Sequence, residues 1–160
     1  MGSTSDLPVM EKAAVILNDL KIPFEMHALS AHRTPEEVER FAAGAARRGI
    51  KVIIAAAGMA AHLPGIIAAM TPLPVIGVPI NASLEGLDSI FSILQMPPGI
   101  PVATVGVNAA QNAGILAAQI IAAGDDKVMK EVIKYRESLK KKIVNANEEL
   151  KKVRFKYKTN

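Results

Sequence analysis

Cysteine and tryptophan are absent from this chain of 160 residues, and its aromatic side chains are limited to two tyrosines and four phenylalanines. Without cysteine the chain forms neither disulfides nor thiolate metal sites. The start of the sequence has no basic segment followed by an apolar one, so no signal peptide is expected. The apolar stretches are far shorter than the roughly 20 residues that a membrane-spanning helix needs. These absences favour a cytoplasmic protein without a membrane span.

Half of the residues are hydrophobic, and most of these are small and aliphatic. A lone domain of this size would leave part of so much apolar surface exposed, and we therefore expect a homo-oligomer. The net charge of +4 is uneven, because residues 125–160 carry +6 and residues 1–124 carry −2. Nucleic-acid proteins more often have a basic face interleaved with aromatic residues. We interpret the basic tail as a solvated helix face, with no nucleic-acid partner.

Short apolar runs rich in β-branched residues alternate with helical patterns along the first 124 residues. Such runs are typical of buried parallel strands. The predicted strands are Phe24 to Leu29, Val52 to Ala57, Val75 to Ile80 and Val102 to Val107. The predicted helices are Leu7 to Leu20, Pro35 to Arg48, Ala60 to Met70, Gly86 to Gln95 and Ala110 to Ala123. This alternation indicates an α/β fold with a doubly wound parallel sheet.

A long helix is predicted after Gly124, from about Asp126, with apolar residues spaced by threes and fours as far as Val153. This apolar stripe is longer than a single small sheet can cover. We therefore divide the chain into an α/β catalytic domain, residues 1–124, and a helical extension, residues 125–160, that packs on a neighbouring subunit. Packing of the helix on its own domain is the alternative.

In an open parallel sheet, ligands bind at the carboxyl ends of the strands, where loops and helix N-termini supply donors. The loop Gly2-Ser3-Thr4-Ser5-Asp6 fits this description, because its glycine and hydroxyl groups can cradle a phosphate. Asp6 is then left to accept hydrogen bonds from sugar hydroxyls. A plain helix cap formed by Ser5 or Asp6 is an equally good interpretation.

The loop Ser30-Ala31-His32-Arg33-Thr34-Pro35 directly follows a predicted strand and places an imidazole beside a guanidinium. Arg33 suits a phosphate or a carboxylate. His32 is able to give and take a proton near neutral pH, as a general acid-base catalyst must. A lone histidine in a loop is commonly structural, and its place at the end of a strand makes catalysis an equally good interpretation.

Residues 56–65 form a third loop made almost wholly of small residues, so a flat ligand can approach its backbone closely. His62 is expected near a helix N-terminus, which suits a neutral, hydrogen-bonding role, and a packed structural role is the alternative. His27 lies in the middle of a predicted strand and is expected to be buried and hydrogen-bonded. The three histidines lack the spacing and companions of metal ligands, so no metal site is predicted.

Five ordered motifs in this chain closely resemble those of the 5-(carboxyamino)imidazole ribonucleotide mutases of purine biosynthesis. They are Gly2-Ser3-x-Ser5-Asp6, Ser30-Ala31-His32-Arg33-Thr34-Pro35, Ala61-His62-Leu63-Pro64-Gly65, Gly86-Leu87-Asp88-Ser89 and Gln95-Met96-Pro97-x-Gly99-Ile100-Pro101. The resemblance runs from Gly2 to about Ala123, and the helical tail matches only in character.

The resemblance implies a three-layer αβα, flavodoxin-like fold and a homo-octamer with active sites at subunit contacts. It implies an isomerase that moves a carboxylate from an exocyclic nitrogen to a ring carbon of a ribonucleotide, with no cofactor and no metal. His32 would be the catalytic proton carrier. The implied substrate-binding residues are Ser3, Ser5, Asp6, Ser30, Arg33, Gly58, His62 and Leu63.

Two features depart from the family pattern. Family members have a hydrophobic strand before the Gly-Ser-x-Ser-Asp motif, in the centre of the sheet, whereas Met1 falls where that strand should be ending. Absence of the strand would expose two ladder edges and much apolar surface. In addition, Ala56 and Met59 stand where the family usually has glycines, and they are expected to narrow the pocket.

Rival functions differ in what they require of the sequence. A sister enzyme carboxylates aminoimidazole ribonucleotide directly with carbon dioxide, but it typically pairs its histidine with lysine and lacks the His-Leu-Pro-Gly loop. Arg33 and His62 therefore favour the mutase. A flavin-binding electron carrier on the same fold is disfavoured, because few aromatic rings are available to stack on the cofactor. A nucleic-acid-binding module would depend on the basic tail alone.

Overall fold

A parallel sheet of three strands lies at the centre of the computed structural model, which describes residues 1–160. The strands are β1 (Ile53–Gly58), β2 (Val75–Ile80) and β3 (Ala103–Thr104), in the order β1-β2-β3. β1 and β2 are paired along their whole length. Both strands are buried, which explains why their sequences are continuously apolar rather than alternating.

Six α-helices flank or extend the sheet, together with three short turns of 3-10 helix. The α-helices are α1 (Leu7–Asp19), α2 (Pro35–Ala45), α3 (Leu63–Met70), α4 (Leu87–Leu94), α5 (Ala110–Ala122) and α6 (Asp126–Lys152). The 3-10 turns are η1 (Thr4–Asp6), η2 (Ala46–Arg48) and η3 (Leu84–Gly86). Every helix predicted from the sequence is present. Pro8, Pro35 and Pro64 lie in the first turns of α1, α2 and α3, where the missing N–H of proline costs no helical hydrogen bond.

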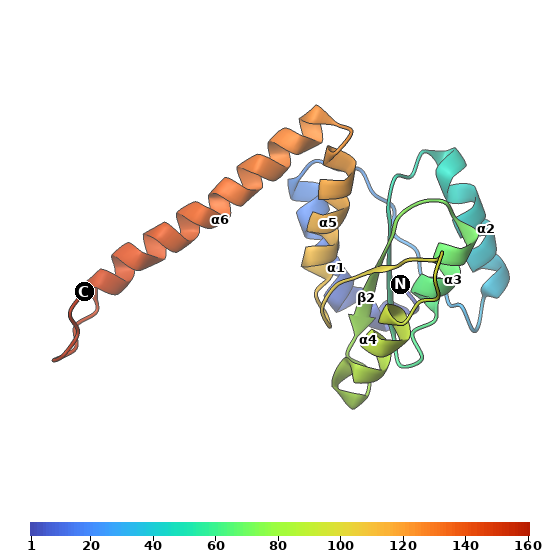
Figure 1. The fold of residues 1–160 in the computed structure, drawn as a ribbon, viewed down its shortest axis with the longest axis horizontal. Coiled ribbons are helices and arrows are strands. Elements are labelled where there is room, and N and C mark those ends of the chain that lie inside the picture. Colours follow the sequence, from blue (N-terminus) through green and yellow to red (C-terminus); the bar gives the residue numbers. More distant parts are fainter.

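Helices α1 and α5 cover one face of the sheet, while α2, α3 and α4 cover the other (Figure 1). Alternate residues of β1 divide between the two cores. Ala56 packs with Met10 of α1 and Ala113 of α5, whereas Ala55 and Ala57 belong to the core under α2 and α3. The predicted three-layer αβα, flavodoxin-like architecture is thus confirmed.

The predicted strand Phe24 to Leu29 is wrong, because this segment is extended but belongs to no sheet. A strand exists only when a neighbouring strand accepts and donates its backbone hydrogen bonds. The backbone of residues 23–29 pairs only with Met1, through Leu29 N–H to the Met1 carbonyl at 2.8 Å and the Met1 amino group to the His27 carbonyl at 3.0 Å. Phe24 and Met26 are consequently exposed.

The last predicted strand is shorter than expected, since only Ala103–Thr104 of Val102 to Val107 pairs with β2. The backbone continues beside β2 through hydrogen bonds from Val105 to Gly77 and from Asn108 to Pro79. Pro79 has no N–H to donate toward this segment, so the ladder does not continue along β2.

The long helix predicted at the C-terminus is confirmed as α6, which extends away from the body of the molecule (Figure 1). The Asp125 side chain caps its start by accepting hydrogen bonds from two backbone N–H groups of the first turn. Only Val132 of this helix is buried. Apolar side chains farther along α6 are exposed, among them Leu139, Ile143 and Leu150. No helix has the combination of length and apolar composition needed to cross a membrane.

Candidate active site

Three loops meet at the carboxyl end of β1, as their places in the sequence predict. The loop after the extended segment contains Ser30 and Arg33, and the Arg33 guanidinium donates to the Gly2 carbonyl at 3.1 Å. Gly2 in turn donates its N–H to the carbonyl of Ala56 in β1 at 3.1 Å. The Ser30 hydroxyl accepts from the Arg33 backbone N–H and from its Nε, each at 3.2 Å. Arg33 is therefore held in place on two sides.

The Gly2 to Asp6 loop forms a capping box at the start of η1. The Ser3 hydroxyl accepts from the Ser5 N–H at 3.3 Å, and the Asp6 carboxylate accepts from the Ser3 N–H at 3.2 Å. The Ser5 hydroxyl also donates to Asp6 at 3.4 Å. Asp6 is buried, whereas Ser5 is exposed. The capping residue is therefore Ser3 and not Ser5 or Asp6, since Asp6 takes part only as the third residue of the capping box and does not cap α1 through its side chain.

His32 and His62 form a direct pair across two of the loops. Nε2 of His32 lies 2.8 Å from Nδ1 of His62, and the rings meet edge to face with their centroids 4.8 Å apart. His62 occupies the N-cap position of α3, as the sequence predicts, without capping the helix through its side chain. Both imidazoles are exposed. A hydrogen bond between two imidazole nitrogens requires that one ring donates and the other accepts.

The loop after β1 is shaped by its backbone. Gly58 has no room for a side chain, since a Cβ there would lie 2.8 Å from the Cβ of Ala82. Met59 has a φ of 56°, in the left-handed region that favours glycine, and its side chain is exposed. This positive φ explains why glycine, which adopts it without strain, is the usual residue of the family at position 59. The Leu63 side chain is buried in the core, so only its backbone N–H, in the first turn of α3, is open to a substrate.

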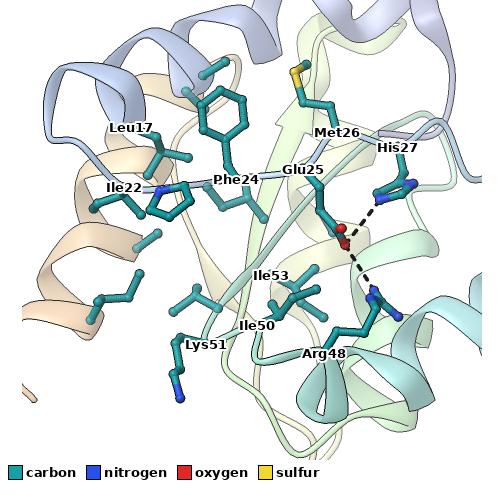
Figure 2. A pocket seen from close by; sticks show the side chains of 18 of the residues that line it. Leu17, Ile22, Phe24, Glu25, Met26, His27, Arg48, Ile50, Lys51 and Ile53 are labelled. Atoms are coloured by element: carbon teal, nitrogen blue, oxygen red, sulfur yellow. Dashed lines mark hydrogen bonds and ion pairs between the residues drawn. The ribbon is translucent and has the colours of Figure 1, made fainter.

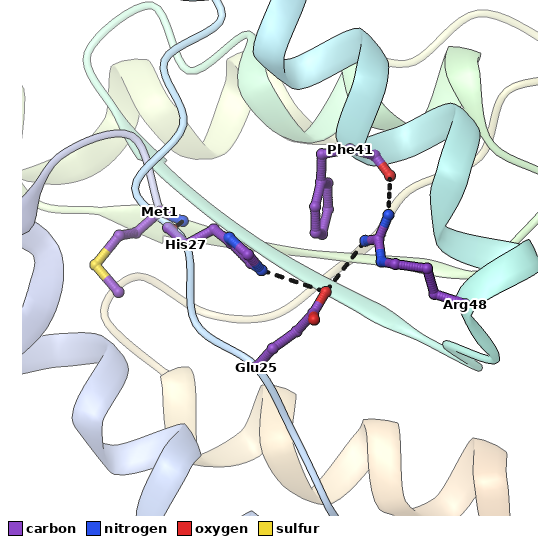
Figure 3. Close-up of polar contacts among 5 residues, drawn as sticks. All are labelled: Met1, Glu25, His27, Phe41 and Arg48. Atoms are coloured by element: carbon purple, nitrogen blue, oxygen red, sulfur yellow. Dashed lines mark hydrogen bonds and ion pairs between the residues drawn. The ribbon is translucent and has the colours of Figure 1, made fainter.

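The prediction that His27 is buried is wrong. Its side chain is exposed and lies 3.3 Å from the Glu25 carboxylate, which also accepts from Arg48 at 3.1 Å (Figure 3). Partial burial raises the pKa of Glu25, but the hydrogen bond from Arg48 and the nearby charges outweigh it and lower the pKa overall. His27 is exposed because no strand lies beside the segment that carries it. This cluster is separate from the His32 and His62 pair.

Polar residues that the sequence did not single out lie in the loops after β2 and β3. The Asn108 side chain accepts from the Asn81 N–H at 3.0 Å and so ties these two loops together. Asn108 has a φ of 56°, which asparagine tolerates better than most residues. The Ser83 hydroxyl donates to Asp88, which lies in the first turn of α4 and belongs to the Gly86-Leu87-Asp88-Ser89 motif. Only the position of these residues in the sequence could have marked them as site candidates, because both loops follow the carboxyl ends of strands.

The site is open to solvent in the single chain. His32, Arg33 and His62 are all exposed, and so is Met59. A single chain therefore does not enclose this loop in a closed, water-free pocket. No group of three or more His, Asp or Glu side chains lies close enough together to hold a metal ion.

Comparison with known proteins connects this arrangement to one family. The sequence profile of the family described as "AIR carboxylase" matches residues 1–142, and this range includes all three loops. The chain belongs to the AIR carboxylase family. Within this family, an N5-carboxyaminoimidazole ribonucleotide mutase of Pyrococcus abyssi is 56% identical over 142 residues, which cover 88% of this chain and 82% of that relative.

Two further relatives of this chain differ in length. A phosphoribosylaminoimidazole carboxylase of Schizosaccharomyces pombe is 52% identical over 98% of this chain, which spans only 28% of that longer relative. The crystal structure of Treponema denticola PurE superposes with a TM-score of 0.81 at 31% identity, covering 95% of this chain and 96% of that one. The domain thus occurs both by itself and within a larger protein.

Proposed function

We propose that this chain is an isomerase that interconverts 5-(carboxyamino)imidazole ribonucleotide and 4-carboxy-5-aminoimidazole ribonucleotide in purine biosynthesis. The observation that carries the proposal is the meeting of Arg33, His32 and His62 at one edge of the sheet. The mutase name of the Pyrococcus abyssi relative supports it. A guanidinium beside an imidazole suits an anionic substrate that has to gain and lose a proton.

The reaction moves one proton in each direction. Protonation of the exocyclic nitrogen by His32 allows the carbamate N–C bond to break, which releases carbon dioxide and leaves an amine. The amine makes the ring an enamine-like nucleophile, and a ring carbon attacks the carbon dioxide to form the new C–C bond. His32 then removes the proton from that ring carbon and returns to its starting state. These steps require no cofactor.

His62 acts in this account as a positioning residue for His32. The 2.8 Å contact between the two rings restricts the rotation of His32 and specifies which of its nitrogens faces away from His62. While Nε2 faces His62, Nδ1 is the nitrogen of His32 that faces the substrate. The exchange of one proton between the substrate and this nitrogen is sufficient for both halves of the reaction.

Arg33 and the first loop bind the ribonucleotide. Ser30 and the Gly2 carbonyl orient the guanidinium, which then offers its remaining N–H donors to the phosphate or the carboxylate. Ser3 and Ser5 supply hydroxyl groups beside it, while Asp6 holds the loop in shape. Gly58 and Leu63 contribute backbone groups from the next loop. The substrate thus spans all three loops.

The active form is a cytoplasmic homo-octamer in which a neighbouring subunit closes each site. The exposure of His32 and His62 supports this part of the proposal, because carbon dioxide has to be retained between the two half-reactions. The exposed apolar side chains of residues 125–160 supply a surface for subunit packing. Light scattering of the full chain is expected to give the mass of eight chains, and a monomeric mass would contradict the assembly.

The activity is tested with two substrates and two histidine variants. Purified protein is given either 5-(carboxyamino)imidazole ribonucleotide or aminoimidazole ribonucleotide with bicarbonate, and 4-carboxy-5-aminoimidazole ribonucleotide is measured. We expect rapid product formation from the first substrate alone. His32→Asn is expected to reduce kcat by about 10²- to 10⁴-fold while substrate binding is retained.

His27→Asn is the matched control, because His27 is an exposed histidine outside the site. It is expected to leave kcat unchanged. Near-normal turnover by His32→Asn would show that another residue carries the proton. Preferential use of aminoimidazole ribonucleotide would favour direct carboxylation, the activity that the name of the Schizosaccharomyces pombe relative describes for that protein.

A further inference from the structure

The hydrogen bond between His32 and His62 joins two atoms that are both able to ligate a metal ion. Nε2 of His32 and Nδ1 of His62 lie 2.8 Å apart and come from two separate loops. An imidazole nitrogen carries a lone pair when it is not protonated, and imidazole is the commonest metal ligand in proteins. The pair therefore offers two ligand atoms to one cation.

The spacing of the two nitrogens is close to that of two ligands on one tetrahedral metal ion. Two Zn–N bonds of about 2.0–2.1 Å at the tetrahedral angle place their nitrogens about 3.3 Å apart. From 2.8 Å, the pair has to open by only about half an ångström. His32 lies in a turn, His62 directly precedes α3, and both side chains are exposed. Rotation of either ring therefore admits a cation without disturbing the core.

A cation between the two nitrogens takes the place of the proton in this hydrogen bond. When both rings are neutral, the donor ring moves its proton to its other nitrogen, so that both facing nitrogens carry lone pairs and no proton is lost. When one ring is cationic, it releases one proton to solvent as the metal binds. Two nitrogen–metal bonds then replace one N–H···N bond, and water occupies the remaining positions of the metal.

The ligand set selects a transition metal over a hard cation. No third His, Asp or Glu side chain lies close enough to complete a metal centre. Arg33 follows His32 in the sequence, and its positive charge opposes any cation. Mg²⁺ and Ca²⁺ require oxygen ligands, whereas imidazole suits Zn²⁺. Two imidazoles thus bind Zn²⁺ reversibly instead of holding it as a structural ion.

His27 provides a single imidazole for comparison. Its exposed side chain lies at the edge of an apolar pocket and points toward Glu25 (Figure 2). Nε2 of His27 is 3.3 Å from a carboxylate oxygen of Glu25, and the same oxygen accepts from Arg48 at 3.1 Å. A cation at this place would have to displace the guanidinium and would gain only one imidazole. His27 is therefore the natural control for the pair.

We propose that the His32 and His62 pair is a reversible inhibitory site for Zn²⁺, which binds Nε2 of His32 and Nδ1 of His62 together. Zn²⁺ occupies the lone pair of Nε2, so His32 is unable to become the cationic acid that protonates the exocyclic nitrogen of the substrate. The Nδ1 side of His32 stays open, and substrate binding is retained. This effect on catalysis rests on the proposed function, whereas the binding of Zn²⁺ does not.

Binding is measured first, without substrate, on the full chain without an added histidine tag. Calorimetric titration with Zn²⁺ compares the unaltered chain with His32→Asn, His62→Asn and His27→Asn, and a second titration uses Mg²⁺. We expect one Zn²⁺ per chain at the pair, with His27→Asn unchanged and no Mg²⁺ bound there. His32→Asn and His62→Asn should each lower the affinity by at least about 10- to 100-fold, the loss that follows even when a group that only orients a ligand is removed.

Turnover of 5-(carboxyamino)imidazole ribonucleotide is measured next, with and without saturating Zn²⁺. We expect Zn²⁺ to lower kcat by about 10²- to 10⁴-fold with KM unchanged, and a chelator to restore it. His62→Asn is expected to keep part of its turnover and to escape this inhibition.

The two measurements separate the metal site from the proposed reaction. Zn²⁺ affinity that neither His32→Asn nor His62→Asn lowers would overturn the proposal, and so would full turnover with Zn²⁺ bound at the pair. A chain that binds Zn²⁺ at the pair but turns over no substrate in its absence would uphold the metal site and contradict the proposed function.

Discussion

The two edges of β1 differ in how they are held. On one edge β1 pairs with β2 over six residues, and on the other it makes one backbone hydrogen bond, to Gly2. On the paired side, β1 is held by its backbone hydrogen bonds to β2 and by the hydrophobic core on both faces of the sheet. On the other side, the loop that carries His32 and Arg33 is attached through a few polar contacts, namely Arg33 to Gly2 and His32 to His62. Half of the candidate site therefore depends on loop contacts instead of sheet pairing.

The largest predicted difference between the two sides is in stability. Ile76 of β2 is fully buried, and Ile76→Ala is expected to lower the free energy of unfolding by about 2–5 kcal/mol. Phe24 lies in the extended segment before the His32 loop and is 45% exposed, so Phe24→Ala is expected to cost less than about 1 kcal/mol. Urea unfolding measures both values. Equal losses would mean that the two edges are equally well packed, contrary to the comparison.

A smaller effect is predicted for the contact that joins the loops. Arg33→Lys keeps the charge but loses the paired N–H groups that reach Ser30 and Gly2. We expect kcat/KM to fall by about 10- to 100-fold, which corresponds to about 1.4–2.7 kcal/mol, with unchanged stability. Arg40→Lys serves as the control, because Arg40 pairs only with Glu37 on the surface. An unaltered kcat/KM for Arg33→Lys would remove Arg33 from the site.

The smallest effect concerns the charge of the Met1 amino group. Burial lowers the pKa of the Met1 amino group, so in the window between this pKa and its ordinary value the unfolded chain binds more protons than the folded one. The free energy of unfolding should therefore rise with pH through this window. Acetylation of the Met1 amino group removes its charge, so in an acetylated chain this rise of the free energy of unfolding with pH is expected to disappear. If the acetylated and free chains have identical pH profiles, the amine is not desolvated.

The sequence predicted the helices well, and the strands only where a partner is present. Val75 to Ile80 became β2 because β1 lies beside it, whereas the run Phe24 to Leu29, which also contains Glu25 and His27, has only Met1 as a partner. Strand formation depends on distant backbone groups that a local pattern does not contain. The same missing neighbour explains why His27 is exposed rather than buried.

The rule that ligands bind at the carboxyl ends of parallel strands predicts the place of the loop after β1. The other two loops follow no paired strand, and they reach the same edge through the hydrogen bonds of Gly2 with Ala56 and with Arg33. The direct contact of His32 with His62 could not be predicted, because it depends on the side-chain directions of two loops 30 positions apart. The link between Asn81 and Asn108 was also missed. Neither asparagine belongs to a motif, and only the positive φ of Asn108 distinguishes it, which the sequence does not reveal.

The fate of carbon dioxide tests the central claim most directly. Unlabelled 5-(carboxyamino)imidazole ribonucleotide is given to the enzyme in labelled bicarbonate, and the product is analysed early, before reversal or spontaneous decay of the substrate mixes the label. If His32, Arg33 and His62 belong to a closed mutase site, the released carbon dioxide is recaptured before it reaches solvent, and early product is unlabelled. Early product with the label content of the solvent would contradict the mutase account.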